Sequence, residues 1–274
     1  MKFRTNAALS LGLLALTAGT VLAGGTLTDG DASFTMLGNP VFATNLPESN
    51  LLTDLGGIDN LAKFTWYYRT PANGQNSYFS KLDNPVENYS GNTASIQYTN
   101  AGPGVAGQER FNATFRIQLL DGANPGEAMV KTTLVFQNNS QGRNSFQVFN
   151  LLDLDLGGIA SAGDDTLKYN AGESRIRFTD KNTAAYGDFV GVNATRFEMA
   201  DQFALRNKLD GGLNNLSNDA NDYTGNGAGA FQWTLDLAAG ESATIESYFT
   251  IAIPTPGSLA VLGLGGLVAG RRRR

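Results

Sequence analysis

The chain has 274 residues, 42% of them hydrophobic, which is enough to bury a sizeable core. It contains neither cysteine nor histidine, which excludes disulfides, thiolate or imidazole metal sites, and catalytic triads that need either side chain. The formal net charge of −5 argues against nucleic acid as a partner.

The N-terminal end has the three parts of a secretory signal peptide. Lys2 and Arg4 form a basic start, an apolar run covers residues 7–18, and small residues precede Gly24. We expect a signal peptide over residues 1–23, cleaved between Ala23 and Gly24, with Sec-type export machinery and signal peptidase as partners. A membrane anchor is the alternative, but the run is shorter than the ~20 residues that a spanning helix needs.

Residues 24–253 alternate between apolar and polar side chains with the period of a β-strand. The clearest stretch is RFNATFRIQLL, where Phe115 and Ile117 fall on one face and Arg116 falls on the other. Similar stretches recur along the body, separated by turns rich in Gly, Asn and Asp. The predicted fold class is all-β: one antiparallel β-sandwich domain over residues 24–253.

The pentapeptide DLGGI occurs twice, at Asp54–Ile58 and at Asp155–Ile159, each time a few residues after NLL. Duplication of a half-sandwich would place the two copies in equivalent turns. We favour coincidence in a chain rich in Gly, Leu and Asp.

An aromatic run, KFTWYYRT, precedes the first of the long turns. Its Trp66, Tyr67 and Tyr68 are candidates for stacking on sugar rings, because aromatic planes on a sheet can do so, and they are equally candidates for core packing. For Trp233, which has Phe231 two residues away, we favour core packing.

The densest acidic cluster is LLDLDLGGIASAGDD. Asp153 and Asp155 fall on one strand face, and Asp164 and Asp165 follow a Gly-rich turn that can fold back towards them. Converging carboxylates suit Ca²⁺. We favour the alternative that the two strand aspartates face solvent, because no spacing here matches a defined calcium loop, and we expect no other cofactor.

One segment, DQFALRNKLDGG, departs from the strand period. Asp201 is a candidate N-cap, Leu205 and Leu209 lie one helical turn apart, and two glycines follow. These features predict a short helix that covers part of the sandwich.

The end of the chain, PTPGSLAVLGLGGLVAGRRRR, has three parts. The first is a proline step made of Pro254, Thr255, Pro256 and Gly257. Residues 258–270 carry no charge and would form a helix of roughly 20 Å, shorter than a ~30 Å hydrocarbon core. The last part is a basic end made of Arg271, Arg272, Arg273 and Arg274, which favours the cytoplasmic side of a membrane.

This three-part end resembles the PEP-CTERM sorting signal of bacteria, with Thr255 where that signal has glutamate. The resemblance covers residues 254–274. It implies an exosortase-like membrane enzyme as a partner, an association with exopolysaccharide, and transient inner-membrane anchoring before display at the cell surface or outside the cell. A plain C-terminal tail anchor is the alternative.

Without its two ends the chain keeps 14 basic residues against 25 acidic ones, a net charge of −11, which strengthens the exclusion of nucleic acid. We therefore expect a non-enzymatic exported surface or matrix protein with no catalytic residues. The second expectation is a carbohydrate- or exopolysaccharide-binding module. The third is a carboxylate-dependent polysaccharide hydrolase, for which the nominal acids are Glu173, Asp188, Glu241 and Glu246.

Overall fold

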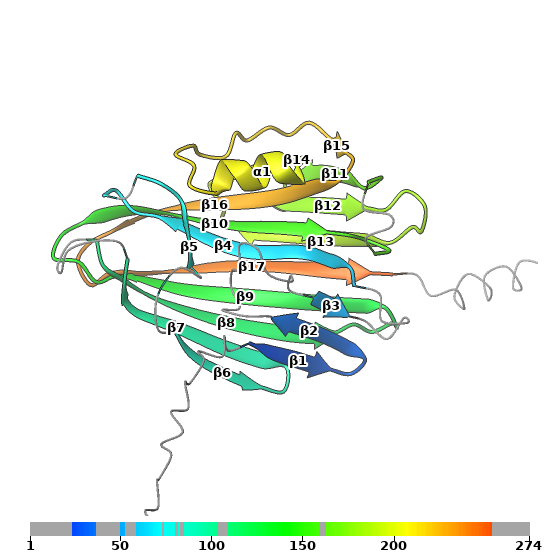
Figure 1. The fold of residues 1–274 in the computed structure, drawn as a ribbon, viewed down its shortest axis with the longest axis horizontal. Helices are drawn as coiled ribbons and strands as arrows, with labels where there is room; N and C mark the ends of the chain where they lie inside the picture. The colour runs from blue at the N-terminus through cyan, green and yellow to red at the C-terminus, as the bar shows by residue number, and fades with distance from the viewer. Residues whose placement is uncertain are drawn as a thin grey trace, which may run out of the picture.

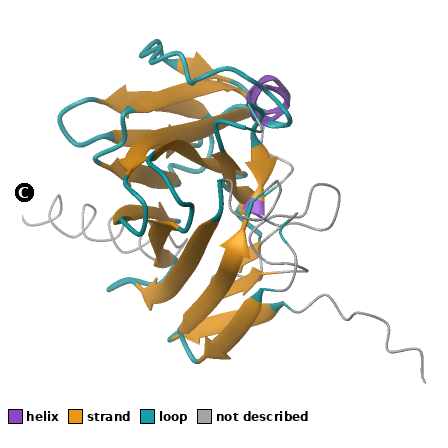
Figure 2. Ribbon diagram, turned by 90° about the vertical axis from the view of Figure 1, so that its left-hand side faces the viewer, coloured by secondary structure: helices purple, strands orange, loops and turns teal. Residues whose placement is uncertain are grey.

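The structure is a computed structural model, and its described part is mostly β-strand (Figure 2). The residues that it describes are 24–36, 50–52 (backbone only), 59–72, 74–79, 82, 85–102, 109–158 and 163–253. The predicted leader, the first DLGGI copy and the predicted sorting tail lie outside these residues. Within them, no helix has both the length and the apolar character needed to cross a membrane.

The larger layer is a nine-stranded antiparallel sheet (Figure 1). In spatial order its strands are β15 (Tyr223–Thr224), β11 (Thr166–Asn170), β12 (Arg175–Thr179), β13 (Tyr186–Val192), β17 (Ser242–Ala252), β9 (Glu127–Asn138), β8 (Phe111–Asp121), β7 (Thr93–Ala101) and β6 (Val86–Ser90). The longest strands stand at its centre and therefore set its shape.

The second layer is made of two smaller antiparallel sheets. The five-stranded sheet has the order β14 (Arg196–Asp201), β16 (Gly227–Leu237), β10 (Asn144–Leu154), β4 (Leu61–Arg69) and β5 (Ser77–Tyr78). The three-stranded sheet has the order β1 (Gly25–Asp29), β2 (Ala32–Met36) and β3 (Asn50–Leu52). Phe34 of β2 contacts both Phe249 of β17 and Phe64 of β4, so the small sheet extends the cover over the nine-stranded one.

The apolar faces of the two layers meet in one core. On β8, Phe115 and Ile117 are buried whereas Arg116 is exposed, as the period-two pattern predicts. Trp66 of β4 contacts Phe115 at 5.5 Å between ring centres and stacks on Trp233 of β16 at 5.8 Å. The prediction of an antiparallel β-sandwich is confirmed, and so is the core position of Trp233, which is 4% exposed.

A buried polar contact also joins the layers. The Ser247 hydroxyl of β17 donates to the Asn150 Oδ1 of β10 at 2.8 Å, and the Asn150 Nδ2 donates to the Thr65 carbonyl of β4 at 3.2 Å. All three residues are at most 1% exposed. A buried polar group that is left without a hydrogen-bond partner costs free energy of folding. This contact therefore favours the one alignment of the two sheets in which these groups are paired.

The predicted helix is present as α1 (Gln202–Leu209), which lies beside β14 and β16 (Figure 1). The Asp201 carboxylate caps it by accepting from the Phe203 and Ala204 backbone N–H groups, each at 3.0 Å. Leu205 and Leu209 are buried, as their spacing predicts.

Asn138 links two turns at one end of the sandwich. Its Nδ2 donates to the carbonyls of Gly142, Leu237 and Ala238 at 2.8, 2.9 and 3.1 Å, and its Oδ1 accepts from the Ser140 N–H at 3.0 Å. The side chain is fully buried, so Asn138→Ala removes the partners of several buried groups at once.

We expect Asn138→Ala to lower the free energy of unfolding by about 3 kcal/mol, measured by urea denaturation. The neighbouring Asn139→Ala is the matched control, because that side chain makes one exposed contact, to Asn100. Equal stability of the two variants would contradict the assigned role.

Candidate functional site

The aromatic residues proposed for sugar stacking belong to the core. Trp66 and Tyr67 are 0% exposed and Tyr68 is 4% exposed. Tyr67 packs on Tyr78 at 4.5 Å, on the side of β4 away from Trp66, so both faces of this strand are covered. All three residues are buried, so the stacking hypothesis for them is wrong.

The acidic cluster is divided by the structure. Asp153 lies on β10 opposite the buried Lys63 of β4, whereas Asp155 directly follows the end of β10. Both aspartates are buried, so the expectation that they face solvent is wrong. Asp164 and Asp165 lie beside a residue that the sequence did not single out, Asp180.

Burial raises the pKa of Asp165 to about 8, and the nearby charges of Asp180, Asp164 and Asp155 act in the same direction. In the second DLGGI copy, Gly157 and Gly158 have φ angles of 78° and 87°, in the left-handed region that favours glycine.

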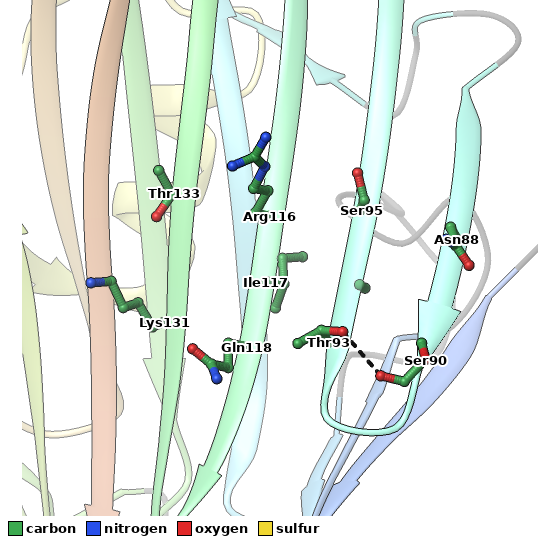
Figure 3. A pocket seen from close by; sticks show the side chains of 10 residues that line it. Asn88, Ser90, Thr93, Ser95, Arg116, Ile117, Gln118, Lys131 and Thr133 are labelled. Carbon is green, nitrogen blue, oxygen red and sulfur yellow. Dashed lines mark hydrogen bonds between the residues drawn. The ribbon is translucent and has the colours of Figure 1, made fainter.

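A hollow of about 480 Å³ lies on the solvent-facing side of the nine-stranded sheet, over β6, β7, β8 and β9 (Figure 3). We call it the outer groove. It is lined by Asn88, Ser90, Thr93, Ala94, Ser95, Arg116, Ile117, Gln118, Lys131 and Thr133. Most of these side chains are polar because they occupy the outward positions of strands whose alternate positions fill the core.

Two cross-strand rows form the floor of the outer groove. The first row follows the pairing of Asn88 with Ser95, Ser95 with Arg116, and Arg116 with Thr133. The second row contains Ser90, Thr93, Gln118 and Lys131 in the same way. Neighbouring strands lie ~4.8 Å apart, so each row presents a series of hydrogen-bonding groups at nearly even spacing.

The outer groove contains two basic side chains, Lys131 and Arg116, and they differ in whether an acidic side chain pairs with them. The Lys131 ammonium forms an ion pair with the Glu246 carboxylate of β17 at 2.8 Å, and both side chains are more than a third exposed. Glu246 is brought there by the pairing of Thr133 with Glu246. Arg116 is exposed, and it takes part in none of the ion pairs found among the described residues. Its guanidinium is therefore available to an anionic group.

The other nominal hydrolase acids are engaged elsewhere. Asp188 accepts from the Arg177 guanidinium at 2.8 and 2.6 Å, and Glu173 pairs with Arg175 at 2.8 Å. Glu241 accepts from the Ala238 N–H at 2.7 Å in a turn. Glu246 alone among the four nominal acids adjoins the outer groove.

A second, smaller hollow of about 280 Å³ lies further along the same face, beside Tyr186, Asp188 and Thr250. The Arg177 guanidinium covers the Tyr186 ring there at 4.7 Å. Because these side chains already satisfy one another, we regard the outer groove as the stronger candidate site.

The fold is shared with solved structures, although no protein-family model and no curated protein matches the chain. A putative aldose 1-epimerase from Escherichia coli K12 superposes with a TM-score of 0.50 at 7% identity, covering 85% of this chain and 99% of that one. A galactose mutarotase-like protein from Lactobacillus casei superposes with a TM-score of 0.50 at 6% identity, covering 84% and 100%. At such identities the likeness concerns the fold alone.

These comparisons correct the first functional expectation. Both neighbours are named after enzymes that act on sugars, which contradicts the expectation of a non-enzymatic surface or matrix protein. The carbohydrate-binding alternative agrees better with the shared fold.

Proposed function

We propose that the domain binds an acidic saccharide in the outer groove. The observation that carries the proposal is the exposed Arg116 guanidinium, which forms no ion pair within the described residues and stands in the first of two rows of mostly hydroxyl and amide side chains (Figure 3). Saccharides present several hydroxyl groups, and a row of side-chain donors and acceptors can bind them together. A carboxylate on the sugar would form charge-assisted hydrogen bonds with Arg116.

The remaining features support a saccharide over other anions. The ten lining residues include three hydroxyl residues on β6 and β7, Ser90, Thr93 and Ser95, and two amide residues, Asn88 and Gln118. The overall negative charge of the chain disfavours a polyanion that lies across the whole surface, so we place the acidic group at Arg116.

The export and sorting expected from residues 1–23 and 254–274 agree with this proposal. A domain carried to the cell surface would meet extracellular polysaccharide, which is the class of ligand that the outer groove suits. This placement is a prediction from the two ends of the sequence.

We expect Arg116→Ala to weaken binding of galacturonic acid oligomers by roughly 10- to 100-fold, because a hydrogen bond to a charged group is worth about 1.5–3 kcal/mol. Isothermal titration calorimetry measures this, with neutral glucose oligomers as the comparison ligand. Arg143→Ala is the matched control, since Arg143 is 59% exposed and pairs with Asp236 away from the groove. Unchanged affinity of Arg116→Ala for the acidic oligomers would overturn the proposal.

A second candidate function, exchange of sugar anomers, is favoured by the Lys131 and Glu246 pair at the groove edge. Anomer exchange needs a base that takes the proton of the anomeric hydroxyl and an acid that protonates the ring oxygen as the ring opens. Glu246 and Lys131 are of the right types for these roles. Polarimetry of freshly dissolved galactose and galacturonic acid tests this, and a rate equal to that of Glu246→Gln would remove the candidate.

A further inference from the structure

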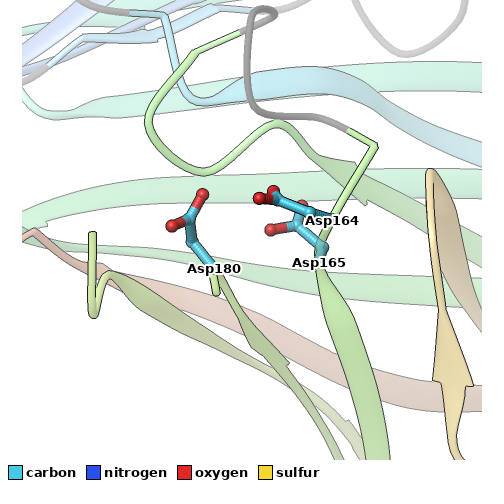
Figure 4. A group of neighbouring side chains, drawn as sticks. All are labelled: Asp164, Asp165 and Asp180. Carbon is cyan, nitrogen blue, oxygen red and sulfur yellow. The ribbon is translucent and has the colours of Figure 1, made fainter. Parts of the chain in front are cut away.

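Three carboxylates meet at one end of the β11 and β12 hairpin, remote in sequence from the outer groove. Asp164 and Asp165 directly precede β11, and Asp180 directly follows β12. The antiparallel pairing of Thr166 with Thr179 then places Asp165 and Asp180 side by side. One carboxylate oxygen from each of the three aspartates lies within 4.8 Å of the other two (Figure 4).

Two of the three aspartates are buried, and Asp164 is half-buried. Asp165 is 1% exposed and Asp180 is 2% exposed. The three carboxylates lean towards a common point between the two ends of the hairpin (Figure 4). Such an arrangement is costly without a counter-charge, because a buried carboxylate loses its hydration and like charges repel most strongly where water is absent.

Each carboxylate keeps one buried oxygen without a partner, and those of Asp164 and Asp180 use the other oxygen within the protein. The Asp180 Oδ1 accepts from the Asn182 and Thr183 N–H groups at 2.6 and 2.5 Å, and the Asp164 Oδ2 accepts from the Asn182 Nδ2. The buried Asp164 Oδ1, Asp165 Oδ1 and Asp180 Oδ2 have no hydrogen-bond partner. None of the ion pairs among the described residues involves these aspartates.

From this geometry we infer that Asp164, Asp165 and Asp180 bind one Ca²⁺ ion. Calcium takes six to eight oxygen ligands at about 2.3–2.6 Å, so two ligand oxygens on opposite sides of the ion are ~5 Å apart. The three carboxylate oxygens, which lie within 4.8 Å of one another, are therefore close enough together to bind one ion. The Asn182 and Thr183 N–H groups hold the Asp180 carboxylate in place from behind, as the outer contacts of metal sites commonly do. Water molecules would complete the coordination.

Calcium suits the site better than softer or smaller cations. The donors are all carboxylate oxygens, whereas zinc and copper favour nitrogen and sulfur ligands, which this chain lacks for want of histidine and cysteine. Magnesium requires near-ideal octahedral geometry, and three side chains from two chain segments adapt more readily to the flexible shell of calcium.

The test is the melting temperature of the intact chain after removal of metal with EDTA, measured at neutral pH with and without millimolar calcium chloride. We expect calcium to raise it by roughly 5 °C or more if the ion is near 100 times its dissociation constant. Calorimetric titration of calcium into the EDTA-treated protein should give one site. Coincident melting curves together with no binding heat would overturn the inference.

Substitutions separate a cation site from a structural role. Asp165→Asn should abolish the calcium shift, because it removes a carboxylate ligand, and yet melt no lower than the wild type in EDTA, because an amide replaces a carboxyl whose charge is disfavoured in the ion-free cluster. A purely structural aspartate would give a variant that melts lower in EDTA and keeps the calcium shift. Asp236→Asn is the matched control, since Asp236 is 64% exposed and should leave the shift unchanged.

Discussion

Trp66→Ala is expected to lower the free energy of unfolding by about 4 kcal/mol, in the range found for the truncation of large buried aromatic residues. The indole is fully buried between the layers, where it contacts Phe64, Phe115 and Trp233 at 6.3, 5.5 and 5.8 Å between ring centres. Its removal leaves a cavity at the point where β4, β8 and β16 meet. Urea denaturation measures the loss.

Trp66→Phe is the matched variant. It keeps an aromatic ring in the core and removes an indole N–H that has no hydrogen-bond partner, so we expect a loss of only ~1–2 kcal/mol. Folded protein of both variants should bind acidic oligomers as the wild type does, because Trp66 lies on the opposite side of the nine-stranded sheet from the outer groove. A selective loss of binding without loss of stability would restore the stacking hypothesis.

The fold was predictable from the sequence wherever one face of a strand is buried in the core and the other face is exposed to solvent. On β8 the alternation of Phe115 and Arg116 identifies both the core side and the solvent side. The helix after Asp201 was predictable from its cap and from the spacing of two leucines.

The burial of the aromatic run was harder to predict from the sequence, because β4 is covered on both faces. Trp66 packs towards the nine-stranded sheet, and Tyr67 packs on Tyr78 on the other side. Three consecutive aromatic residues, Trp66 to Tyr68, break the period-two alternation, and that was the available signal, because consecutive apolar residues are typical of a strand buried on both sides.

The outer groove depends on strand order, which the sequence pattern does not contain. Arg116 was correctly placed on a polar face, but the approach of Lys131 to Glu246 requires β9 and β17 to pair across more than a hundred residues. In the same way, Asp180 joins Asp165 only because β11 and β12 form a hairpin. Period and spacing identify faces, whereas sites assembled from several strands need the topology.

Alkaline pH is expected to destabilise the domain by about 3 kcal/mol between pH 10 and pH 11, because each of three buried tyrosines contributes roughly 1 kcal/mol over that interval. Burial raises the pKa of Tyr67 and Tyr98 well above the ordinary tyrosine value, with the charges of Asp210 and Glu87, respectively, adding to the effect. Burial also raises the pKa of Tyr68 to about 12, partly offset by a hydrogen bond to Ser77.

The sign follows from proton counting. Above about pH 10 the unfolded chain releases tyrosine protons that the folded chain retains, so ionisation favours the unfolded state and stability falls as pH rises. Urea denaturation at a series of pH values measures the slope, and phenolate absorbance should appear together with unfolding. Tyr67→Phe should reduce the slope by about a third, because its hydroxyl is buried without a partner and phenylalanine replaces it at little cost. Equal slopes for the wild type and Tyr67→Phe would show that Tyr67 ionises in the folded state.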